Sequence, residues 1–291
     1  MTRAWPVRAE TPSTPDLAKR SYRDILVLEI VQGLGELRRS ASGLVISGVS
    51  AGLDIGFSVF LMAAVIVLVD GSLAPVTMRF ILANLYSVGF LFVVLGRSEL
   101  FTEHTTLAVF PVLSGRARVS ALARLWSMVY VGNLMGAGLS AALVALVGQA
   151  LGVATAPALR EIADPLLRHP AWVMLASAMI AGWLMGLLSW LVAAGRETIS
   201  QIFFVWLVTC AIGMLQLHHS ILGSVEVAAA IFAQTGVTVA DLGRFLFWST
   251  LGNSIGGTVF VALIKYSHVV RGSSHEANAR EEEAALPRGC P

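Results

Sequence analysis

The sequence predicts an all-α, polytopic membrane protein with six spans. Hydrophobic residues make up 56% of the 291-residue chain and charged residues only 13%, whereas soluble domains carry about 25% charged residues. The mean hydropathy is +0.76. Apolar segments of spanning length occur at residues 43–69, 80–113, 125–151, 171–194, 202–234 and 245–264. Two of these segments are interrupted by polar residues near their centres, as broken membrane helices are.

The regions that flank these segments are polar. We expect residues 1–40 to form a cytoplasmic segment with an amphipathic helix from Pro15 to about Arg39, either a solvated connector or a gating element. Residues 41–270 form the predicted six-span domain, and residues 271–291 a predicted disordered tail. The polar first forty residues show no secretory signal.

Charge and cysteine content exclude several classes of protein. The formal net charge is +2 and no basic run alternates with aromatic residues, so we expect no nucleic-acid partner. Two cysteines, Cys210 and Cys290, form no disulfide framework, and we expect no metal or cofactor. Basic residues in the N-terminal region, with an arginine triplet after the second segment, place both termini in the cytoplasm by the positive-inside rule.

The second and fifth segments each exceed thirty residues, which is too long for one crossing and too short for two crossings with an exposed loop. Their centres read "GRSELFTEHT" (96–105) and "GMLQLHHSILGSVE" (213–226). The third and sixth segments share "GNLMGA" and "GNSIGG". Three spans per half give the halves opposite orientations, so we expect an inverted repeat whose broken helices meet near the midplane of the bilayer.

Ionisable side chains at membrane depth are costly, at least about 2.5–3.5 kcal/mol each. We therefore expect six of them to face the protein interior or water: Glu99, Glu103, His104, His218, His219 and Glu226. Broken backbone needs hydrogen-bond partners or a water-lined cavity as well. Both requirements place the two polar centres together inside the bundle.

His219 is the principal candidate for chemistry, because a neutral imidazole can donate a hydrogen bond to a small anion or exchange a proton with it. The alternative is that His219 only ties the broken helix to a carbonyl group. Thr102 offers a hydroxyl donor and can also cap the second half-helix. His218, about 100° away around a helix, is expected to pack or to serve as a bond partner.

Other polar residues near the breaks leave more than one role open. Glu99 is expected to pair with Arg97 or with freed backbone amides. Glu103 and His104 face a vestibule, a subunit contact or the pore. Asp54 is expected to be buried in the first span, with no assigned role.

Asparagine, glycine and apolar residues near the breaks complete the candidate site. Asn133 and Asn253 are candidate pore residues that are also expected to hydrogen-bond across helices. Small-residue patterns permit close helix contacts at Gly132, Gly136, Gly138, Gly252, Gly256 and Gly257. Apolar side chains that narrow a pore or pack in the core are Phe90, Leu100, Phe101 and Ile212.

The motifs "ELFTEHT", "GNLMGA", "HHSI" and "GNSIGG", in this order, resemble the formate/nitrite transporter family over about residues 40–268. The resemblance implies an aquaporin-like fold, a homopentamer with one pore per protomer in the bacterial inner membrane, and passage of small monovalent anions such as formate, nitrite or hydrosulfide. It further implies that His219 is the central pore histidine and Thr102 the hydroxyl residue of the broken second helix.

The resemblance also implies constriction residues at Leu100 and Phe101 and a second constriction near Ile212. Glu99 takes the place of a family acid, and a basic vestibule residue falls near Arg168 or His169. The chain departs from formate channels at three places. Leu222 and Gly223 follow the histidine in place of a small residue and an asparagine, Trp183 falls near a family asparagine, and Glu103 and His104 add charge.

We therefore predict a channel or proton-coupled transporter for a small weak-acid anion. An intramembrane enzyme, with Ser220 beside His219 or a His/Glu metal site, is disfavoured because adjacent helical residues diverge and no HExxH or GxSxG motif occurs. A third possibility is a non-transporting protein that retains the fold and has an assembly or stress-response role.

Overall fold

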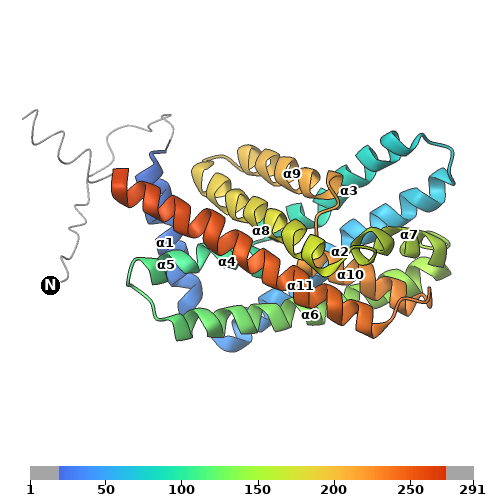
Figure 1. The fold of residues 1–291 in the computed structure, drawn as a ribbon, viewed down its shortest axis with the longest axis horizontal. Helices are drawn as coiled ribbons and strands as arrows, with labels where there is room; N and C mark the ends of the chain where they lie inside the picture. Colours follow the sequence, from blue (N-terminus) through green and yellow to red (C-terminus); the bar gives the residue numbers. More distant parts are fainter. Residues whose placement is uncertain (1–19, 273–291) are drawn as a thin grey trace, which may run out of the picture.

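The computed structural model describes residues 20–272, drawn in Figure 1. Expectations for residues 1–19 and 273–291, including Pro15, Cys290 and the C-terminal tail, lie outside the described residues. The helices are α1 (Tyr22–Arg38), α2 (Ala41–Val69), α3 (Pro75–Gly96), α4 (Phe101–Leu107), α5 (Val109–Leu113), α6 (Val119–Ala150), α7 (Ala156–Leu167), α8 (Ala171–Ala194), α9 (Thr198–Met214), α10 (Ser220–Phe232), α11 (Val239–Ile255) and the π-helix η1 (Gly256–Leu263).

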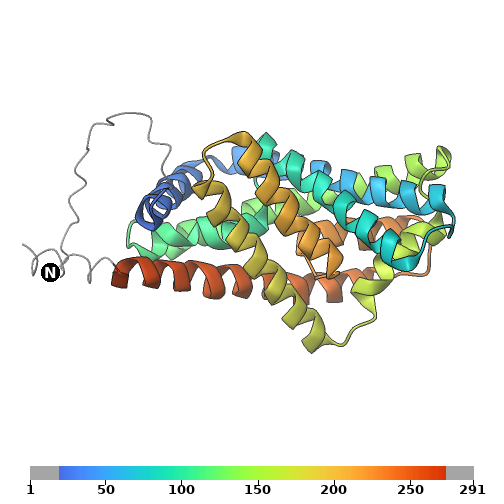
Figure 2. The same cartoon turned by 90° about the horizontal axis from the view of Figure 1, so that it is seen from above.

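The helices of residues 20–272 correspond to the six predicted crossings. Five helices are long and apolar enough to cross a membrane, namely α2, α3, α6, α8 and a continuous last helix from Val239 to Gly272. The fifth crossing is divided between the shorter apolar helices α9 and α10. Both ends of the described chain lie at the same end of the bundle, opposite α7 (Figures 1 and 2).

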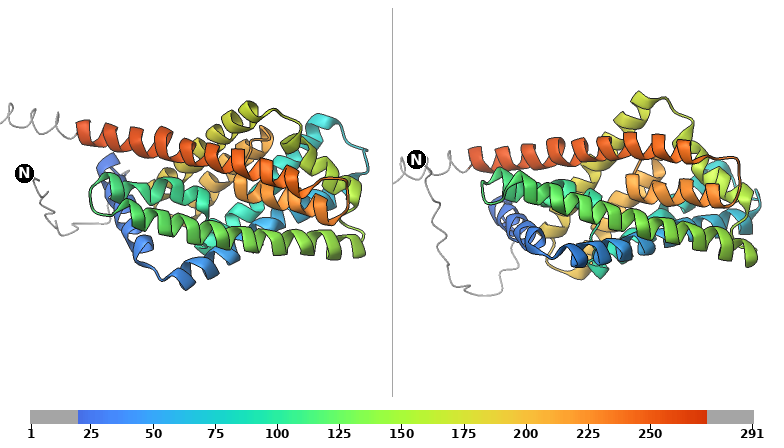
Figure 3. Two further views of the ribbon diagram at one scale, coloured as in Figure 1. Left: turned by 60° about the horizontal axis from the view of Figure 1, so that its bottom comes forward. Right: turned by 90° about the horizontal axis from the view of Figure 1, so that it is seen from below.

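The N-terminal helix α1 begins at Tyr22, later in the chain than expected, because Ser21 caps it. The Ser21 hydroxyl accepts from the backbone N–H of Asp24, and the Asp24 carboxylate accepts from that of Ser21. Such a capping box satisfies two N–H groups that the first helical turn leaves free. The helix lies across the end of the bundle and packs against α4, α5, α6 and α8 (Figure 3).

The two breaks have the same backbone conformation, which supports the inverted repeat. The half-helices α3 and α9 are followed by left-handed residues, Arg97 (φ 57°) and Gln216 (φ 51°). The next N–H group in each case bonds back to the preceding helix, from Ser98 to Val93 and from Leu217 to Ile212, at 3.1 Å. These bonds satisfy carbonyl groups that a helix C-terminus leaves free.

Glycines bring matching pairs of helices into backbone contact in the two halves. A Cβ atom on Gly136 of α6 would lie 2.1 Å from the Val49 carbonyl oxygen of α2, and one on Gly256 would lie 2.1 Å from the Met179 carbonyl oxygen of α8. Gly132 and Gly252 make similar close approaches, while Gly257 faces the Thr105 side chain. The expected packing role is therefore confirmed for these residues but not for Gly138, which faces open space.

Two local irregularities shape the first of the two broken spans and the last helix. Pro111 has no N–H group to give the Leu107 carbonyl oxygen, and α4 ends at Leu107. The last helix adopts π-helical geometry at Gly256–Leu263, where the Thr106 hydroxyl donates to the Gly257 carbonyl oxygen at 2.9 Å. The π-helical segment thus offers a backbone carbonyl group to α4.

Helix α7 was not predicted from the sequence. It lies between the third and fourth spans, with the Thr155 hydroxyl as its N-cap and proline in its first turn. At twelve residues it is too short to span a bilayer. It packs against α10 and α2 and covers the end of the bundle opposite α1 (Figure 1).

Candidate functional site

The two breaks meet through a side-chain hydrogen bond between His219 and Thr102. His219 Nε2 and Thr102 Oγ1 lie 2.9 Å apart, and the two side chains are 1% and 0% exposed. His219 is the N-cap of α10, and Thr102 lies in the first turn of α4, whose N-cap is Leu100. The structure therefore brings together two of the polar residues that the sequence predicted for the pore.

The hydrogen bonds of His219 determine which ring nitrogen carries the proton. Its Nδ1 atom accepts the backbone N–H of Leu222 at 3.2 Å, so Nδ1 carries no proton in this conformation. The neutral imidazole is then protonated at Nε2 and donates to the Thr102 hydroxyl. The Thr102 hydroxyl keeps its own hydrogen free to donate to a bound species.

Apolar side chains close the space around this pair. The ring of Phe90 packs edge-on against His219, with ring centroids 5.0 Å apart. The Tyr86 ring also packs against Phe90, with its centroid 5.4 Å from that of Phe90. Leu100 and Ile212 are fully buried in the same cluster of core side chains. Phe90 thus has a direct place beside His219, while a constriction at Leu100 and Ile212 stays a prediction.

Phe101 points to a different neighbourhood. Its ring packs against Trp126 at 5.8 Å and Tyr130 at 5.0 Å, both on α6. The Tyr130 hydroxyl in turn lies 2.8 Å from that of Thr250 on α11. The aromatic contacts of Phe101 favour helix packing over the expected constriction of the pore.

Asn133 and Asn253 hold the two breaks in the same way. Asn133 Nδ2 donates to the Gly48 and Glu99 carbonyl oxygens at 2.9 and 2.8 Å, and its Oδ1 accepts from Phe101 N–H at 2.8 Å. Asn253 repeats this pattern with the carbonyl oxygens of Ala178 and His218, at 2.8 and 3.0 Å, and with Ser220 N–H at 2.8 Å. The expected bonds across helices are present. Because these bonds use both amide hydrogens, they support a structural role for each asparagine, and the pore-lining role stays a prediction.

His218 serves as a bond partner, as the sequence indicated. Its Nε2 donates to the Leu166 carbonyl oxygen of α7 at 3.1 Å, and its Nδ1 lies 2.8 Å from the Ser177 hydroxyl. The ring also stacks on Phe245, with ring centroids 6.1 Å apart. His218 therefore ties the second break to α7 and α8.

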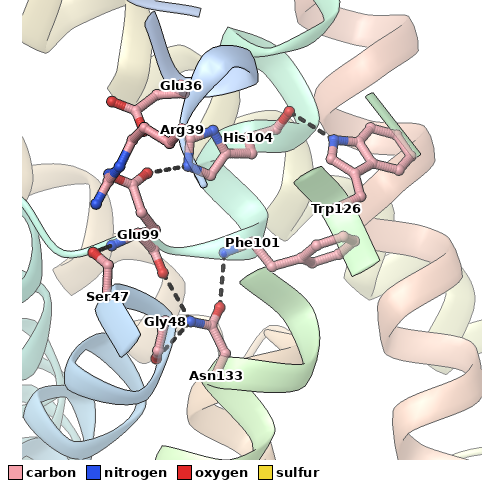
Figure 4. A network of polar contacts seen from close by, with 9 residues as sticks. All are labelled: Glu36, Arg39, Ser47, Gly48, Glu99, Phe101, His104, Trp126 and Asn133. Atoms are coloured by element: carbon pink, nitrogen blue, oxygen red, sulfur yellow. Dashed lines mark hydrogen bonds and ion pairs between the residues drawn. The ribbon is translucent and has the colours of Figure 1, made fainter. Parts of the chain in front are cut away.

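The first break is tied to α1 by a network of charged side chains (Figure 4). The Glu99 carboxylate accepts from Arg39, which follows α1, and bonds to His104 Nε2, one turn into α4. Arg39 also pairs with Glu36 at 2.8 Å. Glu99 therefore pairs with Arg39 and His104, and the expected pairing with Arg97 or freed amides is wrong.

Other groups of the first break are also bonded. The His104 carbonyl oxygen accepts from the Trp126 indole N–H at 3.0 Å, while His104 Nδ1 is buried without a partner among the described residues. Asp54, which is half-buried instead of buried, accepts from the Ser98 hydroxyl at 3.2 Å. Asp54 therefore joins the first span to the break.

Glu103 is half-buried and lies on the α1 side of the breaks, near the buried acid Glu29. It lines a cavity of about 10 Å³ together with Ser189 of α8, whose hydroxyl donates to Glu29 of α1 at 3.0 Å. Glu29 lies outside the spanning helices and is 1% exposed; burial raises the pKa of its carboxyl to about 8. Glu29 and Ser189 were missed from the sequence, although a lone Glu inside the apolar run "ILVLEIV" is a usable signal.

A larger cavity of about 340 Å³ lies on the α7 side of the breaks. Its polar lining residues are Tyr86, Glu161, Asp164, Arg168, Gln216 and Glu226. Arg168 lines this cavity, whereas His169 packs against His218 at a ring-centroid distance of 6.1 Å. A vestibule role for Arg168 stays a prediction. Glu226 is 7% exposed, which confirms that it faces the interior. Tyr86 was not identified from the sequence.

Within residues 20–272, no group of three or more His, Cys, Asp or Glu residues is arranged to hold a metal ion. The arrangement is instead a buried hydrogen-bonding pair between two half-helices, with a cavity on one side and α1 on the other. Such a centre can bind a small polar species at the middle of the bundle.

Sequence comparison places the chain among transporters. The formate/nitrite transporter family model matches residues 25–267. The inner membrane protein YfdC of Escherichia coli (strain K12) is 30% identical over 256 residues, 87% of this chain and 80% of that protein. The nitrite transporter NirC of the same strain is 27% identical over 223 residues, 76% of this chain and 81% of that protein. The formate channel FocA of Escherichia coli (strain K12) is 27% identical over 209 residues, which cover 69% of this chain and 71% of that protein.

Solved structures show the same fold. An FNT family ion channel superposes with a TM-score of 0.74 at 23% identity and covers 84% of this chain and 98% of its own. A pentameric formate channel with formate bound gives a TM-score of 0.64 at 22% identity, with 79% and 98% coverage. The predicted aquaporin-like bundle is confirmed by these likenesses. With a family match over most of its length, this chain belongs to the formate/nitrite transporter family.

Proposed function

We propose that this protein is a membrane channel or proton-coupled transporter for a small monovalent weak-acid anion of the formate or nitrite class. The observation that carries the proposal is the buried Thr102–His219 pair, 2.9 Å apart, at the meeting point of two half-helices. Family membership also supports the proposal, because the named relatives include a nitrite transporter and a formate channel.

The path of the anion follows from the polarity of the groups around this pair. The N-termini of α4 and α10 both point to the centre, and the positive ends of their helix dipoles attract negative charge. Phe90 and its apolar neighbours oppose passage of a bare charge, because a charge in a low-dielectric constriction is strongly destabilised. An anion is therefore drawn to the centre but crosses the constriction best as a neutral acid.

His219 acts in this path as a hydrogen-bond donor. With Nδ1 occupied by the Leu222 N–H, the neutral ring donates its Nε2 hydrogen to Thr102. The Thr102 hydroxyl hydrogen is then open to the anion, and the Nε2 hydrogen reaches the anion only when the anion displaces Thr102. Protonation of the ring requires the Nδ1 contact with Leu222 to break. A donated proton would pass from the imidazolium to an oxygen of the anion and leave neutral imidazole and neutral acid.

The assembly and orientation follow from relatives and from charge. The pentameric formate channel supports a homopentamer, in which exposed apolar side chains contact lipid or neighbouring subunits. YfdC supports the bacterial inner membrane. With α1 and the Arg116–Arg118 loop at one end of the bundle (Figure 1), both termini belong on the cytoplasmic side.

The two alternative functions have less support. Ser220 donates its backbone N–H to Asn253, and its position after the His219 N-cap gives it no role as a nucleophile activated by that ring. A non-transporting protein that retains the fold would not need the hydrogen-bonded Thr102–His219 pair, and this chain keeps it. The named relatives include a nitrite transporter and a formate channel.

Flux into proteoliposomes tests the proposal. The purified protein is reconstituted and assayed with formate, nitrite and hydrosulfide, and glycerol serves as a neutral control. We expect at least one of the three weak acids to enter faster than into empty liposomes. Equal rates in protein-containing and empty liposomes for all three would contradict the proposal.

A further inference from the structure

A groove lined by arginines lies at the α1 end of the bundle. It has a volume of about 430 Å³ and is formed by the last turn of α1, the loop before α6 and the first turns of α6, which meet at this end of the bundle (Figure 1). Its arginines are Arg38, Arg116, Arg118 and Arg124, and no carboxyl group lines it. The groove therefore gathers four positive charges at one place on the surface.

The charge of these arginines is not compensated within the described part of the chain. Arg38, Arg116 and Arg118 are exposed, and no ion pair joins any of them to an acid of residues 20–272. Glu36, two positions from Arg38, pairs with Arg39 instead. Like charges around one groove repel one another, and a bound anion would relieve that repulsion.

The fourth arginine is held in a fixed position. Arg124 Nη2 donates to the carbonyl oxygens of Leu37 and Arg39, at 2.8 and 3.0 Å, and so joins α6 to the end of α1. A guanidinium can donate two further N–H groups to adjacent oxygens of a phosphate. The helix α6 begins at Val119 without a side-chain cap, so the positive end of its dipole adds to the field of the arginines.

Apolar side chains beside the arginines favour a lipid over a free phosphate ion. Those that line the groove are Leu34, Leu37, Ala117 and Ala121. On α1, Val27 and Val31 are each 57% exposed, and they share one helix face with Leu34. Arg38 continues the same face, one turn after Leu34. Such a stripe is typical of a helix at the membrane surface, with apolar side chains among the acyl chains and the basic one among the phosphates.

The position of the groove along α6 agrees with the depth of lipid phosphates. Asn133, which bonds to the first break, follows Arg118 by fifteen residues, or about 22 Å along a helix. Half of the hydrocarbon core of a bilayer is about 15 Å thick. With the breaks near the midplane, Arg118 therefore lies beyond the hydrocarbon, among the headgroups.

We propose that these four arginines form a binding site for the phosphate group of an anionic phospholipid, such as phosphatidylglycerol, in the leaflet at the α1 end of the bundle. The guanidinium groups donate to the phosphate oxygens, and the acyl chains lie against the exposed apolar side chains of α1. The bound lipid joins α1 to α6 and stabilises the docking of α1. This site goes beyond the proposed transport and does not depend on it.

Thermal unfolding of the purified full-length protein in a neutral detergent, titrated with lipid, tests the site. Phosphatidylglycerol is the probe. Phosphatidylcholine, which has a phosphate but no net charge, and inorganic phosphate are added separately at the same concentrations. Arg38→Gln and Arg118→Gln each remove one charge of the groove, from two different elements. Arg271→Gln removes an exposed charge at the same end of the bundle but outside the groove and is the matched control.

We expect phosphatidylglycerol to raise the melting temperature more than phosphatidylcholine does, and inorganic phosphate to leave it unchanged. Arg38→Gln and Arg118→Gln should each raise the phosphatidylglycerol concentration at half effect about fivefold, since each basic residue near an anionic lipid surface contributes a similar share of the affinity. Arg271→Gln should leave that concentration unchanged.

Four outcomes would overturn the lipid site. They are equal effects of the two lipids, a full effect of inorganic phosphate, an unchanged half-effect concentration in both groove variants, and an equal loss in Arg271→Gln. The second would assign the groove to a free anion, and the last would mean a diffuse attraction to the surface. If one groove variant does not fold, the other, on a different element, decides. Absence of weak-acid flux would contradict the proposed function alone.

Discussion

Thr102 and His219 come from opposite halves of the chain, and their side chains are hydrogen-bonded at the centre of the bundle, 2.9 Å apart. His219 and Leu100 occupy the same N-cap position in the two repeats, with nearly the same backbone angles (φ −100°, ψ 120° and φ −107°, ψ 126°). One repeat thus supplies an imidazole where the other supplies an apolar side chain. This asymmetry gives a symmetric scaffold a single polar centre.

Removal of the Thr102 hydroxyl should slow transport without loss of the fold. Thr102→Val keeps the shape of the side chain but leaves the His219 Nε2 hydrogen without its partner, at a cost of about 1–3 kcal/mol. Thr102→Ser retains the hydroxyl and is the control. We expect weak-acid flux in proteoliposomes to fall at least severalfold for Val and to stay near the original rate for Ser. Equal rates for the two variants would argue against a role for the hydroxyl.

The matching bonds of Asn133 and Asn253 predict matching losses of stability. Replacement of either by Leu leaves one backbone carbonyl group and one N–H group of the break unbonded, at about 1–3 kcal/mol for each buried group without a partner. It also removes a bond to a carbonyl group of the neighbouring helix. Both variants should therefore lower the melting temperature in detergent by similar, large amounts. Gln149→Ala, which removes a bond to the same helix, should change it little. A stable Asn133→Leu protein would show that the break needs no such bonds.

Docking of α1 should weaken as pH rises, because of Glu29. Its carboxyl has a pKa of about 8 in the folded protein, raised by burial from 4.5. The Ser189 hydroxyl and the charges of Glu103 and His104 act on it as well. A group with a raised pKa binds more protons in the folded state, so its stabilising contribution is complete below pH 4.5 and is lost as pH rises through about 8.

Hydrogen exchange of α1 amides measures this dependence. Protection should fall between pH 4.5 and 8, by at most about 1.4 kcal/mol per pH unit, after correction for intrinsic exchange rates. Glu29→Gln keeps a hydrogen-bonding group but cannot ionise, so its corrected protection should be flat across this range. A slope that persists in Glu29→Gln would assign the pH dependence to another group.

The pairing of Arg39 with Glu99 should appear as a coupling energy. The Arg39 side chain is 36% exposed, so screening by water reduces its contribution, and we expect a coupling of about 1 kcal/mol. A double-mutant cycle of Arg39→Ala and Glu99→Gln, read by thermal unfolding, measures it. Strictly additive effects would mean that the contact contributes nothing to stability.

The sequence predicted most of the architecture because the bilayer imposes strong rules. Six apolar segments and two polar interruptions were visible, and His219 and Thr102 lie in those interruptions as expected. The repeat was visible through "GNLMGA" and "GNSIGG", and the structure adds that Asn133 and Asn253 bond to the breaks.

Contacts between distant segments could not be predicted. The partner of Glu99 is Arg39, sixty positions away, and local spacing wrongly favoured Arg97. Tyr86 has no local signal, since only the tertiary fold brings it beside Phe90 and Glu226 in one cavity. Helix α7 was missed because its short amphipathic pattern lies between longer apolar segments.

The most direct test of the central claim is the flux of a weak acid through His219→Ala in proteoliposomes, measured as a function of pH. His268→Ala, an exposed histidine in the last helix, is the control for loss of an imidazole. We predict that His219→Ala loses most of the flux or its pH dependence, while His268→Ala keeps both. A folded His219→Ala protein with the full rate and the full pH dependence would contradict the central role of this residue.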